Sequence, residues 1–403
     1  MPVLTNSRHR LYVVLVSSHA ENDLVRPFAL HVPEEALDDL RERLRRTRWP
    51  ERETVSDGTS ASWQQGPPLA YVRELVEAWL AYDWRPVESA LNAHGQALTE
   101  VDGQEVHLLH VRSPRPDAKP LVITHGWPSA VLEPLAVADA LANPDDPDQP
   151  AFHVVAPSLP GYGFGTRPSS PGWSAERTAD AWAELMTRLG YDRFYAAGGD
   201  WGARVTAGLA VRHAERVAGV HSFTPYVEAP GDPEAYGPLS EQERGWLRDR
   251  QDFMDHGRGY SMEQSTRPQT IGYALTDSPV GQLTWVLDKL WAWTDHDGDL
   301  ETAVSRDQVL DLVTLYWLSA TAASSARFYW ENSPPDESGE ITVPSAVTVF
   351  PADIEKLPRP WVERRYTDLR SFRVVERGGH FPMLEVPETY VAELRAGLGA
   401  LPW

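Results

Sequence analysis

The segment GGDWG, residues 198–202, has the spacing of a nucleophile turn between a strand and a helix, with small residues flanking Asp200 at the reactive position. Glycines suit such a sharp turn, because its central residue is strained. The turn raises that side chain above the sheet edge, where the N-terminus of the next helix favours negative charge. A carboxylate there can attack carbon and form a covalent ester. The alternative is that Asp200 only caps the helix, since aspartate is a favoured N-cap residue.

Two later segments favour the catalytic interpretation. VFPADI places Asp353 just after an expected strand, and RGGHF places His380 just after the last one. The chain order of nucleophile, acid and histidine is that of α/β-hydrolases, so we expect these three side chains at one sheet edge. THGWPSA follows an earlier strand, where this fold builds half of its oxyanion hole. The backbone N–H groups of Trp127 and Trp201 are therefore the expected oxyanion donors.

The elements that must position these residues alternate along the chain. Segments that read as strands, KPLVIT, AFHVVAP, RFYAAGG and VAGVHSF, are separated by amphipathic helices, and a hairpin with an Asp-Gly turn precedes them. This βαβα order predicts an α/β fold with a mostly parallel sheet and helices on both faces. Near Tyr226 the alternation gives way to helical, aromatic sequence, and strands return with SAVTVF and FRVVER.

Four regions follow from this pattern. They are an N-terminal helical region (1–97), the first part of the core (98–226), a helical cap inserted after the sixth expected strand (227–340) and the second part of the core (341–403).

The composition limits the possible partners. The 403-residue chain has a formal net charge of −21 at pH 7 and no cysteine. Nucleic acids and anionic membranes select basic surfaces, so this charge argues against both. Without cysteine, disulfides and thiolate catalysis are excluded. The apolar run from Leu11 to Val16 is shorter than a secretory signal uses and far too short to span a bilayer, so we expect a cytoplasmic protein.

Taken together, these motifs resemble the epoxide hydrolases of the α/β-hydrolase superfamily, specifically the microsomal-type branch. The likeness covers nearly the whole chain and rests on RPFALHVPEEALDDLRERLRRTRWP, HGWP, PSLPGYGFG, GGDWG, GYSMEQSTRPQTIGYALTDSPVG, SSARFYWEN, FPADI and GGHF. The membrane anchor that some members of the branch carry has no counterpart in these motifs.

The resemblance implies a first chemical step and the groups that assist it. Asp200 would open an epoxide ring by attack on carbon, which leaves an alkyl ester on the protein. The expelled alkoxide is a poor leaving group, so phenols that stay protonated at neutral pH would donate to it. By motif, the family's two cap tyrosines fall on Tyr260 and Tyr329, with Tyr273 and Tyr316 in reserve.

The resemblance also implies the second step and the surroundings of the substrate. His380, oriented by Asp353, would activate the water that hydrolyses the ester to a vicinal diol. Trp127, Trp201 and Phe381 would contact the substrate. No metal or organic cofactor is called for, and a homodimer is common in the family. The sixteen tryptophans suggest an aromatic pocket for a bulky apolar or aryl epoxide.

Two alternative functions remain open at this point. Haloalkane dehalogenases share the DWG turn, but a halide leaves without a proton, whereas a pair of tyrosines suits an alkoxide. Dehalogenases also more often carry a polar halide-holding residue where Trp127 stands. The other alternative is a non-catalytic protein that uses the fold to bind a small molecule. A serine esterase is disfavoured because the turn carries no serine.

Overall fold

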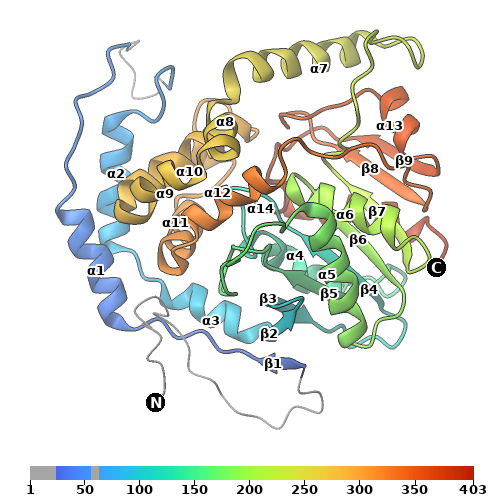
Figure 1. Cartoon of the computed structure of the whole chain (residues 1–403), viewed down its shortest axis with the longest axis horizontal. Coiled ribbons are helices and arrows are strands. Elements are labelled where there is room, and N and C mark those ends of the chain that lie inside the picture. Colours follow the sequence, from blue (N-terminus) through green and yellow to red (C-terminus); the bar gives the residue numbers. More distant parts are fainter. Residues whose placement is uncertain (1–23, 56–62) are drawn as a thin grey trace.

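The computed structural model describes residues 24–55 and 63–403, so the apolar run from Leu11 to Val16 lies outside the described residues. The described chain forms a nine-stranded sheet in the order β1-β2-β3-β5-β4-β6-β7-β8-β9 (Figure 1). The first three junctions, β1–β2, β2–β3 and β3–β5, are antiparallel, and the other five are parallel. The strands are β1 (Val25–Pro27), β2 (Gln96–Val101), β3 (Gln104–Val111), β4 (Lys119–Thr124), β5 (Phe152–Pro157), β6 (Phe194–Gly198), β7 (Val217–Ser222), β8 (Ser345–Val349) and β9 (Leu369–Val374).

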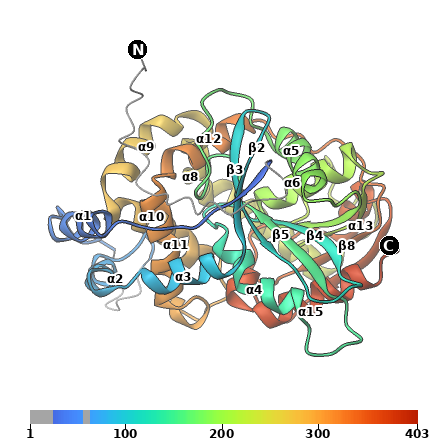
Figure 2. The ribbon, with the colours of Figure 1, turned by 90° about the horizontal axis from the view of Figure 1, so that it is seen from below.

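Helices cover both faces of this sheet. Figure 2 shows α5 and α6 on one side of it and α4 and α15 on the other. Successive strand residues point to opposite faces. In β4, Val122 therefore packs on the side of α5 and α6, whereas Leu121 and Ile123 pack with residues of α4 and α15. The core helices are α4 (Leu132–Ala142), α5 (Ala175–Arg188), α6 (Trp201–Arg212), α13 (Arg359–Arg365), α14 (Pro382–Glu385) and α15 (Pro387–Gly399).

A helical insertion separates β7 from β8. It consists of α7 (Glu241–Asp252), a π-helical turn (Phe253–Gly257), α8 (Gly259–Thr266), α9 (Pro268–Asp277), α10 (Pro279–Trp293), a 3-10 turn (Leu300–Thr302), α11 (Arg306–Ser319) and α12 (Ala322–Glu331). The N-terminal helices α1 (Glu34–Arg45), α2 (Leu69–Ala81) and α3 (Arg85–Ala93) lie beside this insertion rather than over the sheet (Figures 1 and 2). The indole of Trp79 in α2 donates to Thr314 Oγ1 in α11 over 2.8 Å, which joins the two regions.

The structure confirms the α/β-hydrolase fold and corrects one detail of it. The N-terminal region, expected to be helical, contributes the short strand β1, whose Arg26 lies opposite Leu98 of β2. β2 itself begins at Gln96, two residues before the expected boundary at 98. Counted from β1, the helical insertion therefore follows the seventh strand and not the sixth. A three-residue strand ending in Pro27 is too short to show the alternation that identifies strands in a sequence.

In the part of the chain that the structure describes, no helix combines the length and hydrophobicity needed to cross a membrane.

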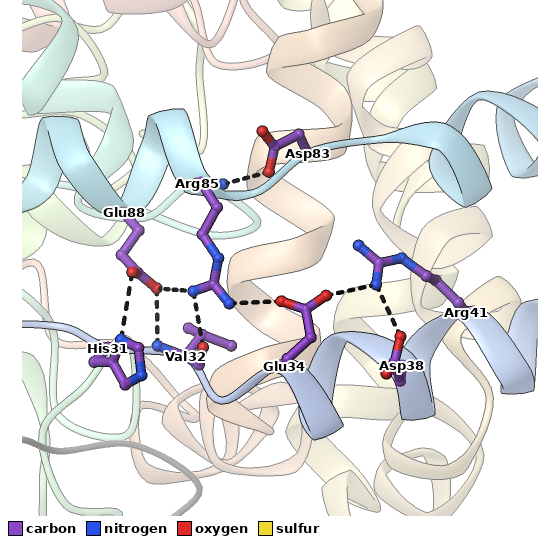
Figure 3. A network of polar contacts seen from close by, with 8 residues as sticks. All are labelled: His31, Val32, Glu34, Asp38, Arg41, Asp83, Arg85 and Glu88. Carbon is purple, nitrogen blue, oxygen red and sulfur yellow. Dashed lines mark hydrogen bonds and ion pairs between the residues drawn. The ribbon is translucent and has the colours of Figure 1, made fainter.

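A polar network attaches the segment before α1 to α3 (Figure 3). The guanidinium of Arg85 donates to the Val32 carbonyl over 2.8 Å and to the carboxylates of Glu88 and Glu34, each over 2.9 Å. Glu34 also accepts from Arg41, over 2.8 Å. The two arginines lower the pKa of Glu34. Their stabilising effect is therefore present above the ordinary pKa of glutamate and is lost as the pH falls through the lowered value.

Arg85→Ala is expected to lower Tm by roughly 1–3 °C at low salt, because it removes contacts that join two segments far apart in the sequence. The loss should shrink at high salt, since the pairs are partly exposed and screened. Arg41→Ala is the matched control, because among the described residues the ion pairs of Arg41 are those with Glu34 and Asp38 of its own helix. Thermal unfolding at two salt concentrations checks this, and equal losses for both variants would contradict it.

Candidate active site

Asp200 stands at a strained turn between β6 and α6. Its backbone has φ 50° and ψ −130°, a region that residues other than glycine rarely adopt. Glycine is required beside it, because a Cβ on Gly202 would lie 1.9 Å from the Thr124 carbonyl oxygen and one on Gly198 would lie 2.6 Å from the Gly202 backbone. The Asp200 side chain makes no capping hydrogen bond to α6. Its position is therefore that of a presented carboxylate and not that of a helix cap.

Asp200, His380 and Asp353 meet at the carboxyl ends of the parallel strands. His380 Nδ1 lies 2.7 Å from Asp353 Oδ1, and His380 Nε2 lies 3.6 Å from Asp200 Oδ2. All three side chains are buried. Asp353 is held in turn by the Thr224 hydroxyl, which donates to its Oδ2 over 3.2 Å. The three residues that the sequence placed after β6, β8 and β9 thus form one connected arrangement.

The charge state of His380 depends on its two carboxylate neighbours. Burial disfavours the imidazolium, but Asp353 and Asp200 outweigh it and raise the pKa of His380 well above its usual range. While Asp200 is a carboxylate, His380 is therefore held protonated. Any reaction that neutralises Asp200 removes one of the two supporting charges and makes His380 a stronger proton acceptor.

The loop that carries His380 is fixed by the insertion. The His380 N–H donates to the Trp293 carbonyl over 2.8 Å, and Trp293 is the last residue of α10. A Cβ on Gly379 would lie 2.4 Å from that oxygen, so the position requires glycine. Glu385 accepts the N–H groups of Gly379 and Phe381, over 2.9 and 2.8 Å. The Trp293 ring also packs edge-on against His380, 5.1 Å between centroids.

One of the two expected oxyanion donors contacts the Asp200 carboxylate, and the other directly follows Asp200 in the chain. The Trp127 N–H donates to Asp200 Oδ1 over 2.8 Å. Trp201 is the first residue of α6, where N–H groups have no partner within the helix. A Cβ on Gly126 would lie 2.5 Å from Asp200 Oδ1, so glycine is needed for this close approach.

The two motif tyrosines come from different helices of the insertion and meet above Trp127. Tyr260 of α8 stacks on the Trp127 ring, with centroids 5.1 Å apart and planes at 8°. Tyr329 of α12 packs edge-on against Trp127 at 5.7 Å and against Trp201 at 4.8 Å. The two phenol rings lie 5.9 Å apart. Burial and the charge of Asp200 raise the pKa of both phenols, so both are protonated at neutral pH.

The hydroxyl of Tyr329 differs in its contacts from that of the reserve candidate Tyr316. In the described residues, the buried Tyr329 hydroxyl has no hydrogen-bond partner of good geometry. Tyr316 is also buried, but its hydroxyl donates to the Ser129 carbonyl over 2.8 Å. Tyr273 is 72% exposed and lies outside the site. Phe381 packs edge-on against His380 at 5.1 Å and stacks with Trp293 at 6.2 Å.

Two cavities touch this arrangement. A small one of about 10 Å³ is lined by Asp200 and His380, together with His125, Gly126, Trp127, Ser129, Glu133, Gly199, Phe223 and Phe381. A larger cleft of about 780 Å³ reaches Tyr260, Trp293 and Asp353 from the surface of the insertion. Neither tyrosine lines the small cavity. Trp127 joins Asp200 to the phenols, because its N–H donates to Asp200 Oδ1 and its ring contacts both tyrosines.

The sheet, the strained turn and the arrangement of acid and histidine define this chain as an α/β-hydrolase. The family model described as alpha/beta hydrolase fold matches residues 119–297, and the model described as epoxide hydrolase N terminus matches residues 25–134. A Stigmatella aurantiaca protein, provisionally named an epoxide hydrolase, is 46% identical over 92% of this chain and 84% of its own. Epoxide hydrolase 1 of Sus scrofa is 31% identical over 95% of this chain and 90% of its own.

A solved structure gives the same result. The epoxide hydrolase of Aspergillus niger superposes with a TM-score of 0.84 at 31% identity, covering 93% of this chain and 96% of that one. These findings confirm the resemblance seen in the motifs. The chain belongs to the epoxide hydrolase family, and it is an epoxide hydrolase.

Proposed function

We propose that Asp200 attacks a ring carbon of the epoxide and that the reaction passes through an alkyl ester of this residue. The observation that carries the proposal is the Asp200 carboxylate itself, presented at a strained turn with Oδ1 on the Trp127 N–H and Oδ2 facing His380. A bond forms between Oδ2 and carbon while the ring carbon–oxygen bond breaks. Oδ1 becomes the ester carbonyl oxygen, already seated on an oxyanion donor.

In this scheme Tyr260 and Tyr329 donate to the departing oxygen. Both phenols are buried within ring contact of Trp127, which carries the oxyanion N–H on its backbone, and their raised pKa keeps the protons available. We also infer that residues 227–340 act as the cap, because this region supplies both tyrosines. The aromatic surroundings favour a bulky apolar or aryl epoxide as substrate.

Hydrolysis of the ester needs a base, and His380 fits that role once Asp200 has lost its charge. Neutral His380 takes a proton from water, and the resulting hydroxide adds to the ester carbonyl carbon. The tetrahedral oxyanion is held by the N–H groups of Trp127 and Trp201, and Asp353 stabilises the imidazolium. Collapse of the intermediate releases the diol oxygen, which takes the proton from His380. Asp200 is left as a carboxylic acid, and loss of the remaining water proton to solvent restores its carboxylate.

A single turnover in oxygen-18 water tests the covalent route. With enzyme in excess over styrene oxide, the new diol oxygen comes from the Asp200 carboxylate, so the first diol carries no label. The label should enter the carboxylate instead and appear in diol on later turnovers. Labelled diol in the first turnover would mean direct attack by water and would overturn the proposal.

Tyr260→Phe and Tyr329→Phe are each expected to slow ester formation by about 10²–10³-fold, as removal of one oxyanion donor does in other enzymes. Ester hydrolysis should change less, because its proton moves through His380. Single-turnover tryptophan fluorescence with styrene oxide can separate the steps. Tyr273→Phe is the matched control, since its exposed hydroxyl lies outside the site. An unchanged rate in both active-site variants would remove the tyrosines from the reaction.

The rate of ester hydrolysis is expected to rise about tenfold per pH unit until His380 becomes neutral, because only neutral imidazole accepts the proton. Asp353 and Asp200 raise the pKa of His380 in the free enzyme. Esterification removes the Asp200 charge, so the acid limb of hydrolysis should lie below the pH at which His380 titrates in the free enzyme. Stopped-flow hydrolysis profiles and imidazole titration by NMR check this order, and the reverse order would contradict it.

A further inference from the structure

A carboxyl group without a role in the steps above lies beside Asp200 and His380. Glu133, the second residue of α4, is 3% exposed. Its Oε2 accepts a hydrogen bond from the Ser129 hydroxyl, whose backbone follows the HGWP segment. Its Oε1 is buried and has no hydrogen-bond partner among the described residues. Buried polar atoms are nearly always hydrogen-bonded in proteins, so this oxygen calls for an explanation.

The small cavity provides one. Glu133, Ser129, Asp200 and His380 all line it, and its volume of about 10 Å³ is close to the least that holds one water molecule. A buried water needs two to four polar partners. Besides Glu133 Oε1, His380 Nε2 is also buried without a hydrogen-bond partner in the described part of the chain. The cavity therefore offers a single water two polar atoms that lack a hydrogen bond, and one of them, His380 Nε2, lies 3.6 Å from Asp200 Oδ2.

We propose that Glu133 is a positioning residue that holds the hydrolysing water between its Oε1 and His380 Nε2, facing the ester carbonyl of Asp200. This inference rests on the proposed covalent route. One water hydrogen is donated to Glu133, and the other is donated to His380. With both hydrogens engaged, the oxygen lone pair is left to point at the carbonyl carbon of Asp200.

The proton balance leaves Glu133 unchanged through the step. The water O–H bond on the His380 side breaks, its proton moves to Nε2, and its oxygen bonds to the Asp200 carbonyl carbon. The proton on the Glu133 side stays on the oxygen that joins Asp200. Its transfer to solvent returns Asp200 to a carboxylate, while the diol oxygen leaves with the proton from His380.

The charges around Glu133 suit this role. Burial raises the pKa of Glu133 to about 7, whereas the Ser129 hydrogen bond and the charge of His380 act to lower it. The carboxylates of Glu385 and Asp200 raise it further. Esterification removes the Asp200 charge, and protonation of His380 during the attack then favours the charged form of Glu133. The carboxylate is thus best accommodated at the moment when the imidazolium forms.

Glu133→Gln tests the proposal without changing the volume of the side chain. If the amide oxygen keeps the Ser129 hydrogen bond, the NH₂ group faces the cavity and cannot accept from water. We expect ester formation from styrene oxide to keep its rate, and ester hydrolysis to slow by about 10–100-fold, as misplacement of a reacting group does. In steady state kcat and KM should fall together, which leaves kcat/KM nearly unchanged. The ester should accumulate and appear as a mass increase on the intact protein.

The amplitude of the ester-forming phase counts folded, active sites, so partial misfolding does not distort the comparison. Ser129→Ala, which releases Glu133 Oε2, should produce a smaller slowing of the same step. Glu393→Gln is the matched control, because Glu393 is a buried carboxylate on α15 that pairs with Arg373 away from the site. It should leave both steps unchanged.

Four results would overturn the inference. Hydrolysis in Glu133→Gln at the native rate would show that the water is held without this residue. Equal slowing of both steps would indicate a general structural role. Accumulation of ester in His380→Gln but not in Glu133→Gln would reject the role of Glu133 and leave the covalent route intact. Absence of ester in both variants would reject the covalent route and the inference with it.

Discussion

Asp200→Ala is expected to lower diol formation by about 10⁴-fold or more. In the proposed covalent route, the variant loses the atom that bonds to the substrate. Direct attack by water should not replace this step, because the variant has no base placed to activate a water molecule beside the ring. Chromatography of diol from styrene oxide measures the loss. Intact-mass analysis should show no adduct, whereas the native protein is expected to give one under single-turnover conditions.

Asp200→Gly separates the chemical loss from the strain of the turn. Glycine adopts φ 50° and ψ −130° without the Cβ conflict that alanine keeps. Both variants should be inactive, but the glycine variant should unfold at the higher temperature, because backbone strain of this kind costs about 1–3 kcal/mol. In ordinary secondary structure the order of stability is reversed, because alanine is there more stable than glycine. Retention of activity within tenfold in either variant would exclude Asp200 as the nucleophile.

The meeting of Asp200, Asp353 and His380 could be predicted because their positions follow from topology. In a parallel sheet the carboxyl ends of the strands share one edge, so a residue just after β6, β8 or β9 is brought to that edge whatever the intervening sequence. Asp200, Asp353 and His380 meet there over distances of 2.7 and 3.6 Å. Thr224, which holds Asp353, follows β7 at the same edge. The same rule would have placed Thr224 at that edge, but an isolated threonine does not by itself indicate a role.

Residues that depend on packing between distant elements could not be predicted in this way. Trp293 is one of sixteen tryptophans, and only the docking of α10 on the His380 loop gives its carbonyl a role. Glu133 lies in the apolar segment LEPLAVADALA, where an acidic side chain would be expected on the exposed face of the helix. It is buried because α14 and α15 pack over α4. β1 gave no signal either, since three residues cannot show a period.

The tyrosines illustrate what a motif adds to residue types. Tyr260, Tyr316 and Tyr329 are all buried aromatic residues of one helical region, and periodicity alone does not separate them. The resemblance selected Tyr260 and Tyr329. The physical distinction became visible only with the hydroxyl partners, because Tyr316 is already bonded to the Ser129 carbonyl.

His380→Gln is expected to stop the reaction after its first step. Ester formation depends on the Asp200 carboxylate and the phenols, so it should proceed within about tenfold of the native rate. Hydrolysis loses its base, and turnover should fall by about 10⁴-fold, as removal of a triad member does elsewhere. The intact protein should therefore gain the mass of one substrate molecule and keep it for many native turnover times. Peptide mapping should locate that mass on the segment containing Asp200.

Asp353→Asn provides the graded comparison for this result. It keeps the His380 imidazole but removes the carboxylate that Nδ1 contacts at 2.7 Å, which lowers the pKa of His380 and leaves its orientation less fixed. Ester should accumulate here too, but decay faster than in His380→Gln, because a weakened base remains. If His380→Gln instead abolishes ester formation as well as hydrolysis, His380 must act before the ester exists. The imidazolium would then assist ring opening, and the roles proposed for His380 and the two phenols would have to be exchanged.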